Sequence, residues 1–333
     1  MSTTEPFRPA DDSRTDPHDR PTDGPTDPIT DGVIGIDQAQ LEADLVVPDE
    51  ASESPGQRFR RRLFSNRWAL VALVYLVALV LVAIFAPWIA PKELSDQDLG
   101  NALAGPFDGS GLLGTDGLGR DVLSRMIFAT RVALLAVFQA VLVGLILGVT
   151  PGLIAGFFGG WVDSIIMRFT DAVMSFPPLI LALAIVGVLG ANLRNAMIAV
   201  GVIFAPTFLR LVRGSVLSVR EETYIEASRS IGTRNWRIIF RHVLPNVLPP
   251  LLVQIALTSG FAMLAEASLS FLGLGVQPPD ASWGTILDEG RRRLSEQPWL
   301  VVWPGLALGL TVLAFNVLGD GIRDSLGRET RKE

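Results

Sequence analysis

Residues 68–90 read WALVALVYLVALVLVAIFAPWIA and contain no charged side chain. The run exceeds the roughly 20 residues that a helix needs to cross the hydrocarbon core of a bilayer. Comparable apolar runs follow at about 127–157, 162–190, 195–212, 246–274 and 299–319. Hydropathy therefore predicts an all-α fold, a polytopic membrane bundle with six transmembrane helices.

The composition agrees with this class, because 49% of the 333 residues are hydrophobic and the mean hydropathy is +0.40. Residues 1–57 hold 14 Asp and Glu against three Arg, whereas the whole chain has a net charge of −6. This segment is rich in Pro, Asp, Thr and Gly and lacks apolar periodicity, so a disordered acidic tail is predicted. The first apolar run begins only at Trp68, so no cleavable signal peptide is expected. The membrane domain is expected to cover 58–327, followed by a short tail at 328–333.

The distribution of basic residues predicts the orientation in the membrane. If residues 58–67 are cytoplasmic, the inside segments hold 16 of the 25 Lys and Arg that follow residue 57, and the outside segments hold seven. Both termini and the segment 210–245 are therefore expected in the cytoplasm. A bacterial inner membrane is the simplest location.

Small residues and prolines within the predicted spans indicate how the helices pack. Four glycines spaced four residues apart form one stripe along which another helix can approach closely: Gly144, Gly148, Gly152 and Gly156. The stripe is expected either as ordinary helix packing or as a seam within a moving bundle. Pro177 and Pro178 predict a kink or a break in the third span.

Three ionisable residues within spans are candidates for translocation or gating, because each costs roughly 2.5 to 3.5 kcal/mol near the membrane centre. Arg168 and Asp171 are three residues apart, so they are expected either to pair along one helix face or to take part in gating. Glu266 has no cation nearby in the sequence. It is a candidate for lining a wet pathway, with a hydrogen bond to a neighbouring helix as the alternative.

The sequence contains no recognisable catalytic or cofactor-binding motif. Residues 109–114, GSGLLG, fit G-x-G-x-x-G, but no strand is predicted before them, so a loop is expected. A P-loop requires Gly-Lys-Ser or Gly-Lys-Thr, whereas Lys92 and Lys332 are each followed by Glu. Cysteine is absent, and His18 and His242 are far apart. We therefore expect no enzyme activity, no metal site and no cofactor in this chain.

Residues 226–245, EASRSIGTRNWRIIFRHVLP, form a charged segment between two predicted spans. A helix over about 220–231 is expected to end at Gly232 in a left-handed cap. A second helix is expected from Asn235 until Pro245. It would carry an apolar stripe beside a basic row: Trp236, Ile239, Phe240 and Val243 with Arg234, Arg237 and Arg241. Periodicity alone favours either a helix lying on lipid headgroups or one docked in a partner protein.

The same segment resembles the EAA loop of ABC importer permeases, in which E-A-A is followed by three residues, G, nine residues, I, one residue and L-P. The matching positions, at the family spacing, are Glu226, Ala227, Gly232, Leu244 and Pro245. Ser228 replaces the second alanine, and His242 stands where the pattern has isoleucine. The reading RHVLPN at 241–246 is similar to the peptide and nickel branch of the family.

Further stretches resemble that branch and extend the likeness over most of residues 58–327: 113–121, 159–163, 266–278 and 314–320. The chain is similar to the C-type permease subunit of dipeptide and oligopeptide importers. The resemblance implies the type I importer permease fold, a peptide substrate and a lipid environment, with no nucleic-acid partner. It also implies a second homologous permease as heterodimer partner, two cytoplasmic ABC ATPase subunits that hold ATP and Mg²⁺, and an external solute-binding protein.

On this resemblance the loop couples transport to the partner ATPase through Glu226, Ala227, Gly232, Arg234, Trp236, Arg237, Leu244 and Pro245. The resemblance also places four external residues against the solute-binding protein: Asp116, Arg120, Asp121 and Trp283. Turn and N-cap roles ahead of a helix near Val122 explain Asp116 and Asp121 equally well. Three alternatives stay open: a nickel importer permease, a membrane anchor without transport activity, and a stand-alone channel or secondary carrier that uses Glu266, Arg168 and Asp171.

Overall fold

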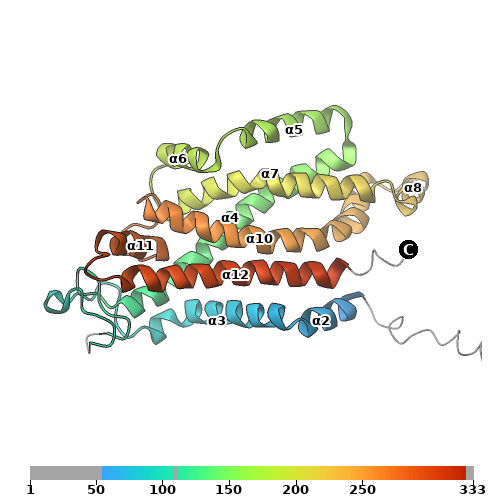
Figure 1. Cartoon of the computed structure of the whole chain (residues 1–333). Coiled ribbons are helices and arrows are strands. Elements are labelled where there is room, and N and C mark those ends of the chain that lie inside the picture. The colour runs from blue at the N-terminus through green and yellow to red at the C-terminus, as the bar shows by residue number, and fades with distance from the viewer. Residues whose placement is uncertain (1–54, 109–110, 328–333) are drawn as a thin grey trace, which may run out of the picture. The chain divides into compact units, whose positions relative to one another are not determined.

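The computed structural model describes residues 55–108 and 111–327 (Figure 1). Its elements are helices, in the order α2 (Pro55–Ser65), α3 (Arg67–Ile89), η2 (Leu99–Asn101), α4 (Val122–Phe158), α5 (Gly160–Met174), α6 (Pro178–Leu189), α7 (Leu193–Val219), α8 (Thr223–Ser230), α9 (Asn235–Ile238), η3 (Ile239–Val243), α10 (Leu244–Phe271), α11 (Trp283–Arg292) and α12 (Trp299–Gly327). β-pairing in these residues is limited to one isolated bridge, between Thr115 and Asp121. The predicted all-α class is confirmed.

The ends of the predicted domain fall near the limits of the described chain. The acidic tail lies outside the described residues up to position 54, and the tail at 328–333 lies outside them entirely. Helix α2 begins at Pro55, slightly before the boundary predicted at residue 58. Residues 111–114, the described part of the glycine motif, form a turn rather than a nucleotide-binding strand and helix.

Five helices of the described chain are long and apolar enough to cross a membrane: Arg67–Ile89, Val122–Phe158, Leu193–Val219, Asn235–Phe271 and Trp299–Leu326. The remaining predicted span, 162–190, consists of α5 and α6, which meet at an angle of 91°. Pro177 occupies the N-cap of α6 and Pro178 begins the helix. Because neither proline has an N–H to continue the hydrogen bonds of α5, the helix breaks here. With this pair counted as one span, six crossings result, as predicted.

Polar side chains begin three of the spans by accepting hydrogen bonds from free backbone N–H groups. Asn66 caps α3 by accepting from Trp68 and Ala69 at 3.2 Å. Asp121 caps α4 at 2.7 Å from the N–H of Ser124, and Asn192 caps α7. Each such cap stabilises its helix by about 1 kcal/mol. The predicted helix start near Val122 is confirmed.

The glycine stripe of α4 packs against α7. All four glycines are buried, and a Cβ placed on Gly148 would lie 2.6 Å from the carbonyl oxygen of Ala205 and 2.7 Å from Cβ of Phe208. The fit is reciprocal, because Gly201 of α7 faces Val143 of α4 at a similarly short distance. Lipid gives no hydrophobic drive for helix association, so such close backbone packing holds the pair together.

The described helices have two distinct ends, which we call the α8 end and the α11 end (Figure 1). The α8 end carries α2, α8, α9 and the last turns of α12. The α11 end carries α11 and the loop residues 90–108. Helix α12 runs between α3 and α10 and contacts both of them.

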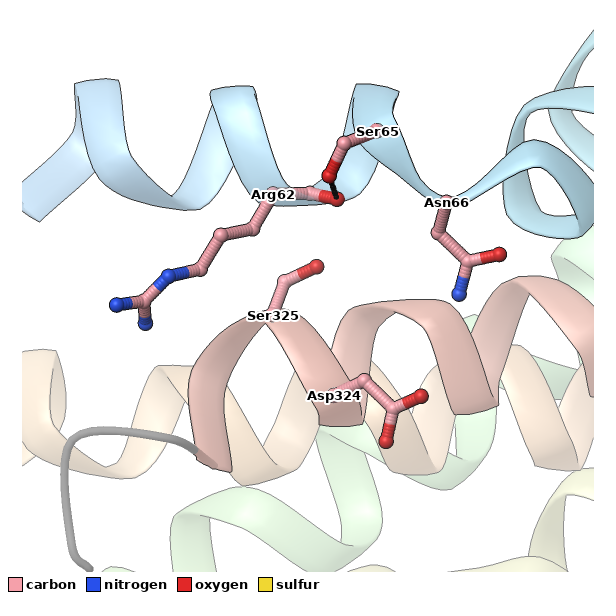
Figure 2. Close-up of a pocket in the computed structure, with 5 residues that line it drawn as sticks. All are labelled: Arg62, Ser65, Asn66, Asp324 and Ser325. Carbon is pink, nitrogen blue, oxygen red and sulfur yellow. Dashed lines mark hydrogen bonds between the residues drawn. The ribbon is translucent and has the colours of Figure 1, made fainter.

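At the α8 end, α2 packs on the last turns of α12. A pocket of about 260 Å³ lies between these helices. Figure 2 shows the residues that line it: Arg62, Ser65, Asn66, Asp324 and Ser325. Ser65 donates to the carbonyl oxygen of Arg62 at 2.8 Å, and Ser325 donates to that of Gly321 at 2.7 Å. Each hydroxyl group therefore donates to a backbone carbonyl of its own helix. None of the predicted site residues lines this pocket.

Candidate functional site

Helices α8 and α9 form an elbow, residues 223–243, between α7 and α10. Gly232 turns the chain between the two helices with a φ of 77°. Its N–H bonds to the carbonyl oxygen of Arg229 at 2.9 Å, and the N–H of Thr233 bonds to that of Ser228 at 3.1 Å. This is a Schellman cap, in which glycine adopts the left-handed conformation without a steric penalty. The cap predicted at Gly232 is confirmed.

The elbow and the first two residues of α10 carry the predicted coupling residues. Leu244 is half-buried and the others are exposed: Glu226, Ala227, Gly232, Arg234, Trp236, Arg237 and Pro245. Buried side chains anchor the elbow from within: Ile225, Ile238, Ile239 and Val243. The guanidinium group of Arg229 lies 5.0 Å from the ring centre of Phe157, at the end of α4. The structure thus brings the predicted set together, while its coupling role stays a prediction.

Tyr224 links α8 to the start of α10. Its hydroxyl accepts a hydrogen bond from the Asn246 side chain at 3.2 Å, and its ring lies 6.2 Å from that of His242. Burial raises the pKa of Tyr224, and the negative charge of Glu222 raises it further. The phenol therefore stays protonated at neutral pH and fixes the elbow to α10 as a neutral group.

The predicted apolar stripe is divided between two faces, which corrects the sequence-based expectation. Ile239 and Val243 are buried, whereas Trp236 and Phe240 are each 58% exposed. The two exposed rings stack on each other, with centres 5.9 Å apart and planes inclined by 19°. Successive residues on a helix point about 100° apart, so the pair Trp236 and Phe240 and the pair Ile239 and Val243 fall on opposite sides of the boundary between the exposed and the buried face.

Pro245 does not end the helix, contrary to the prediction. The N–H of Leu244 bonds to the carbonyl oxygen of Ile239, five residues back, in the wider π pattern. Proline lacks an N–H and crowds the preceding turn, and such local widening accommodates it. A continuous helix results over Asn235–Phe271. The elbow is therefore joined to a membrane span without a loop between them.

Glu266 is fully buried near the far end of this helix. Its Oε1 accepts a hydrogen bond from the hydroxyl of Ser270 at 2.7 Å, and that hydroxyl also accepts the N–H of Val276 at 3.2 Å. Its Oε2 has no partner among the described residues. In this conformation the side chain lines no open path, since it is enclosed between α10 and the following loop. Its part in gating stays a prediction.

The predicted pairing of Arg168 with Asp171 is wrong. Both side chains are exposed, and Asp171 pairs with Arg210 of α7 at 2.6 Å. A second ion pair joins the same helices, because Arg213 donates to both carboxylate oxygens of Asp163 at 2.5 and 2.6 Å. The break after α5 lays this helix along α7, so its acids reach the arginines of α7 more readily than the one on their own helix.

Three of the residues predicted to face a solute-binding protein are buried at the α11 end, which corrects that expectation. Trp283 is 1% exposed, and its Nε1 donates to the carbonyl oxygen of Met126 at 3.3 Å. Asp121 caps α4. Asp116 accepts the N–H groups of Leu118 and Arg120 at 2.9 and 3.0 Å, as well as Nε of Arg120 at 2.6 Å. The alternative turn and cap roles account for both acids.

Two charged residues that sequence reasoning missed complete this cluster. Arg125 is 5% exposed, and its Nε lies 3.3 Å from Oδ2 of Asp116. Glu289 of α11 accepts the N–H of Gly117 at 3.0 Å and lies 3.4 Å from Nη2 of Arg120. The sequence did contain a signal for Arg125. It lies one turn after the N-cap of a long apolar helix, and a charge at such a position requires a buried partner.

Sequence comparison relates the chain to membrane transport subunits. Residues 141–332 match the family of binding-protein-dependent transport system inner membrane components, and residues 54–106 match the N-terminal transmembrane domain of oligopeptide transport permease C. The chain is 43% identical to the dipeptide transport system permease protein DppC of Alkalihalophilus pseudofirmus, over 82% of this chain and 90% of that one. It is also 43% identical to the glutathione transport system permease protein GsiD of Escherichia coli, over 87% and 95% of the two chains.

The fold agrees with a solved member of this class. A chain of the MetNI methionine ABC transporter, in an inward-facing conformation, superposes with a TM-score of 0.51 at 19% identity, covering 60% of this chain and 96% of that one. The helix order, the elbow between two spans and both family matches lead to one assignment. The chain belongs to the binding-protein-dependent transport system inner membrane components, and is a C-type permease subunit of an ABC importer.

Proposed function

We propose that this permease moves short peptides across a bacterial inner membrane and is driven by ATPase subunits that dock on the elbow. The supporting observation is the elbow itself. It exposes charged and aromatic side chains while its inner face is locked into the bundle. Charged groups and a stacked aromatic pair are typical of protein interfaces, where Trp and Arg carry much of the binding energy. In this proposal ATP and Mg²⁺ bind the partner subunits.

The elbow is connected so that a docked ATPase would move two spans. α8 follows α7 directly, and α9 continues into α10 as one helix. Closure of two ATPase subunits would then displace the elbow and tilt α7 and α10 together. Because α4 packs tightly against α7, it would follow the same motion.

The open face of α5 supports a second permease as partner. Arg168 and Asp171 are exposed on this helix, and Arg210 meets it from α7. Charges within a spanning segment rarely face lipid tails, because the cost of burying them there is several kcal/mol. We infer that this side lies against the second permease and the translocation pathway.

A peptide substrate is supported by the relatives, which are named as permeases for dipeptides and for glutathione. The basic-residue distribution supports an elbow on the cytoplasmic side and an α11 end that faces the solute-binding protein. In that orientation both termini are cytoplasmic.

Charge reversal at Glu226 tests the proposal in the complete transporter. We expect Glu226→Arg to abolish peptide uptake and co-purification of the ATPase, with normal insertion in the membrane. Glu93→Arg, the same reversal at an exposed residue of the α11 end, is the matched control and should leave co-purification of the ATPase unchanged. Normal uptake and ATPase binding in Glu226→Arg would contradict the docking role. Nickel accumulation in place of peptide uptake, or flux through liposomes that contain this chain alone, would contradict the proposed substrate or mechanism.

A further inference from the structure

A cavity of about 560 Å³ opens at the α11 end, between the start of α4, the loop after α10 and α11. Its volume lies within the usual range for small-molecule sites. Four arginines and four acids line it: Arg120, Arg125, Arg292, Arg293, Asp280, Asp288, Glu289 and Glu296. Equal numbers of opposite charges suit a ligand that carries both signs better than a simple anion or cation.

Most of these arginines are already paired with neighbouring acids. Arg292 pairs with Asp288, and Arg293 lies 3.4 Å from Glu296. Arg120 is held by Asp116 at 2.6 Å. These three arginines line the cavity but are already bonded to acids.

Arg125 differs, because it is buried and only partly satisfied. Its Nε lies 3.3 Å from Asp116, but its Nη1 has no hydrogen-bond partner among the described residues. Asp116 cannot readily supply another bond, since it already serves Arg120 and two backbone N–H groups. A buried donor without an acceptor costs roughly 1 to 3 kcal/mol, and more when charged. A guanidinium group matches a carboxylate in shape, through two parallel hydrogen bonds.

We propose that this cavity receives a short zwitterionic peptide, with its terminal carboxylate on Arg125 and its ammonium group on acids that line the same cavity. The proposal rests on the proposed function and names the part of the peptide that this chain recognises. The side chain of Asp280 is exposed, and that of Glu289 is part-buried and faces Arg120, so the acidic side is accessible at the rim.

The test uses the complete transporter in proteoliposomes, with its ATPases and its binding protein. Import of dialanine is compared with import of dialanine amide, which lacks the terminal carboxylate. We expect wild-type transporter to favour the free acid. Arg125→Gln should slow import of the free acid about tenfold and leave the amide nearly unchanged, because a charge-assisted bond is lost only for the former. The preference of the binding protein cancels when each peptide is compared between variant and wild type.

Arg194→Gln is the matched control, because Arg194 is exposed at the start of α7 and does not line the cavity. It should preserve the preference for the free acid. If Arg125→Gln fails to assemble, Arg125→Lys keeps the charge without the planar fork and should still lose much of the preference. Equal slowing of both peptides, or an unchanged preference in Arg125→Lys, would overturn the inference. Wild-type transporter that imports neither peptide would instead overturn the proposed peptide function.

Discussion

Arg213 of α7 donates two hydrogen bonds to Asp163 of α5, from Nε and Nη2 to the two carboxylate oxygens. Both side chains are partly shielded, at 29% and 19% exposure. The pair fixes the helix that precedes the 91° break against the helix that leads into the elbow. It therefore connects the broken span to the part of the chain that is proposed to bind the ATPase.

Breaking this pair should destabilise the protein. We expect Asp163→Asn to lower the free energy of unfolding by about 2 kcal/mol, because it removes charge-assisted hydrogen bonds from a partly buried site. Thermal unfolding in detergent measures the effect. Asp171→Asn is the matched control, since its pair with Arg210 is exposed and surface pairs contribute little. Equal shifts in the two variants would contradict the special role of the Asp163 pair.

The glycine stripe of α4 predicts that the stability of the bundle depends sharply on side-chain volume at these positions. Gly148→Ala should destabilise the bundle by roughly 1 to 3 kcal/mol, because its Cβ would press on the backbone of Ala205 and force α4 and α7 apart. Gly214→Ala lies on α7 with no atom within 4 Å of the new Cβ and should be tolerated. Purified yield and the thermal transition in detergent compare the two. Equal yields and equal thermal transitions for the two variants would contradict the prediction, because they would show that α4 and α7 can move apart without loss of stability.

The proposed orientation can be tested with single cysteines, since the natural chain has none. Ile231 is 82% exposed on the elbow and Leu112 is 58% exposed at the α11 end. In intact cells an impermeant thiol reagent should label Leu112→Cys, whereas Ile231→Cys should react only after the membrane is opened. The reverse pattern would place the elbow outside and exclude an ATPase there.

Asp288 on α11 predicts that the stability of the protein depends on pH. Burial alone would raise the pKa of Asp288, but hydrogen bonds and charges from Arg292 and Arg291 outweigh it, so the pKa lies below its usual range. A lowered folded-state pKa stabilises the protein above the unfolded-state pKa, near pH 4, and the contribution is lost as the pH falls through the folded-state value. Asp288→Asn should therefore lower the thermal transition at neutral pH and match wild type in strong acid. A difference between the transition temperatures of Asp288→Asn and wild type that stays constant with pH would contradict this prediction.

Hydropathy was sufficient to predict the spans and the all-α class, because lipid requires long apolar helices whose backbone groups bond internally. Local signals were equally dependable: Asp121 caps α4 and Gly232 caps α8, since each acts on backbone groups a few residues away. These features depend only on short stretches of sequence and on the lipid environment, so they can be predicted without knowing how the helices pack.

Long-range choices could not be predicted in the same way. Arg168 was the nearest cation to Asp171 in sequence, but the break at Pro177 brings Arg210 within reach. Trp283 carries no mark of burial in its neighbouring residues, yet it packs against α4. Ile239 is buried and Phe240 is exposed on one helix, and the packing of that helix decides where the boundary between the two faces falls. Each miss arose where tertiary packing decided between options that were equally good locally.

The uninterrupted helix from Asn235 to Phe271 has 37 residues, which corresponds to about 55 Å at 1.5 Å per residue. Trp236 sits at one tip, and Glu266 and Ser270 lie at the other. A displacement of the elbow by a docked partner would therefore reach, along one continuous helix, the end where Ser270 lines the same cavity as Arg125.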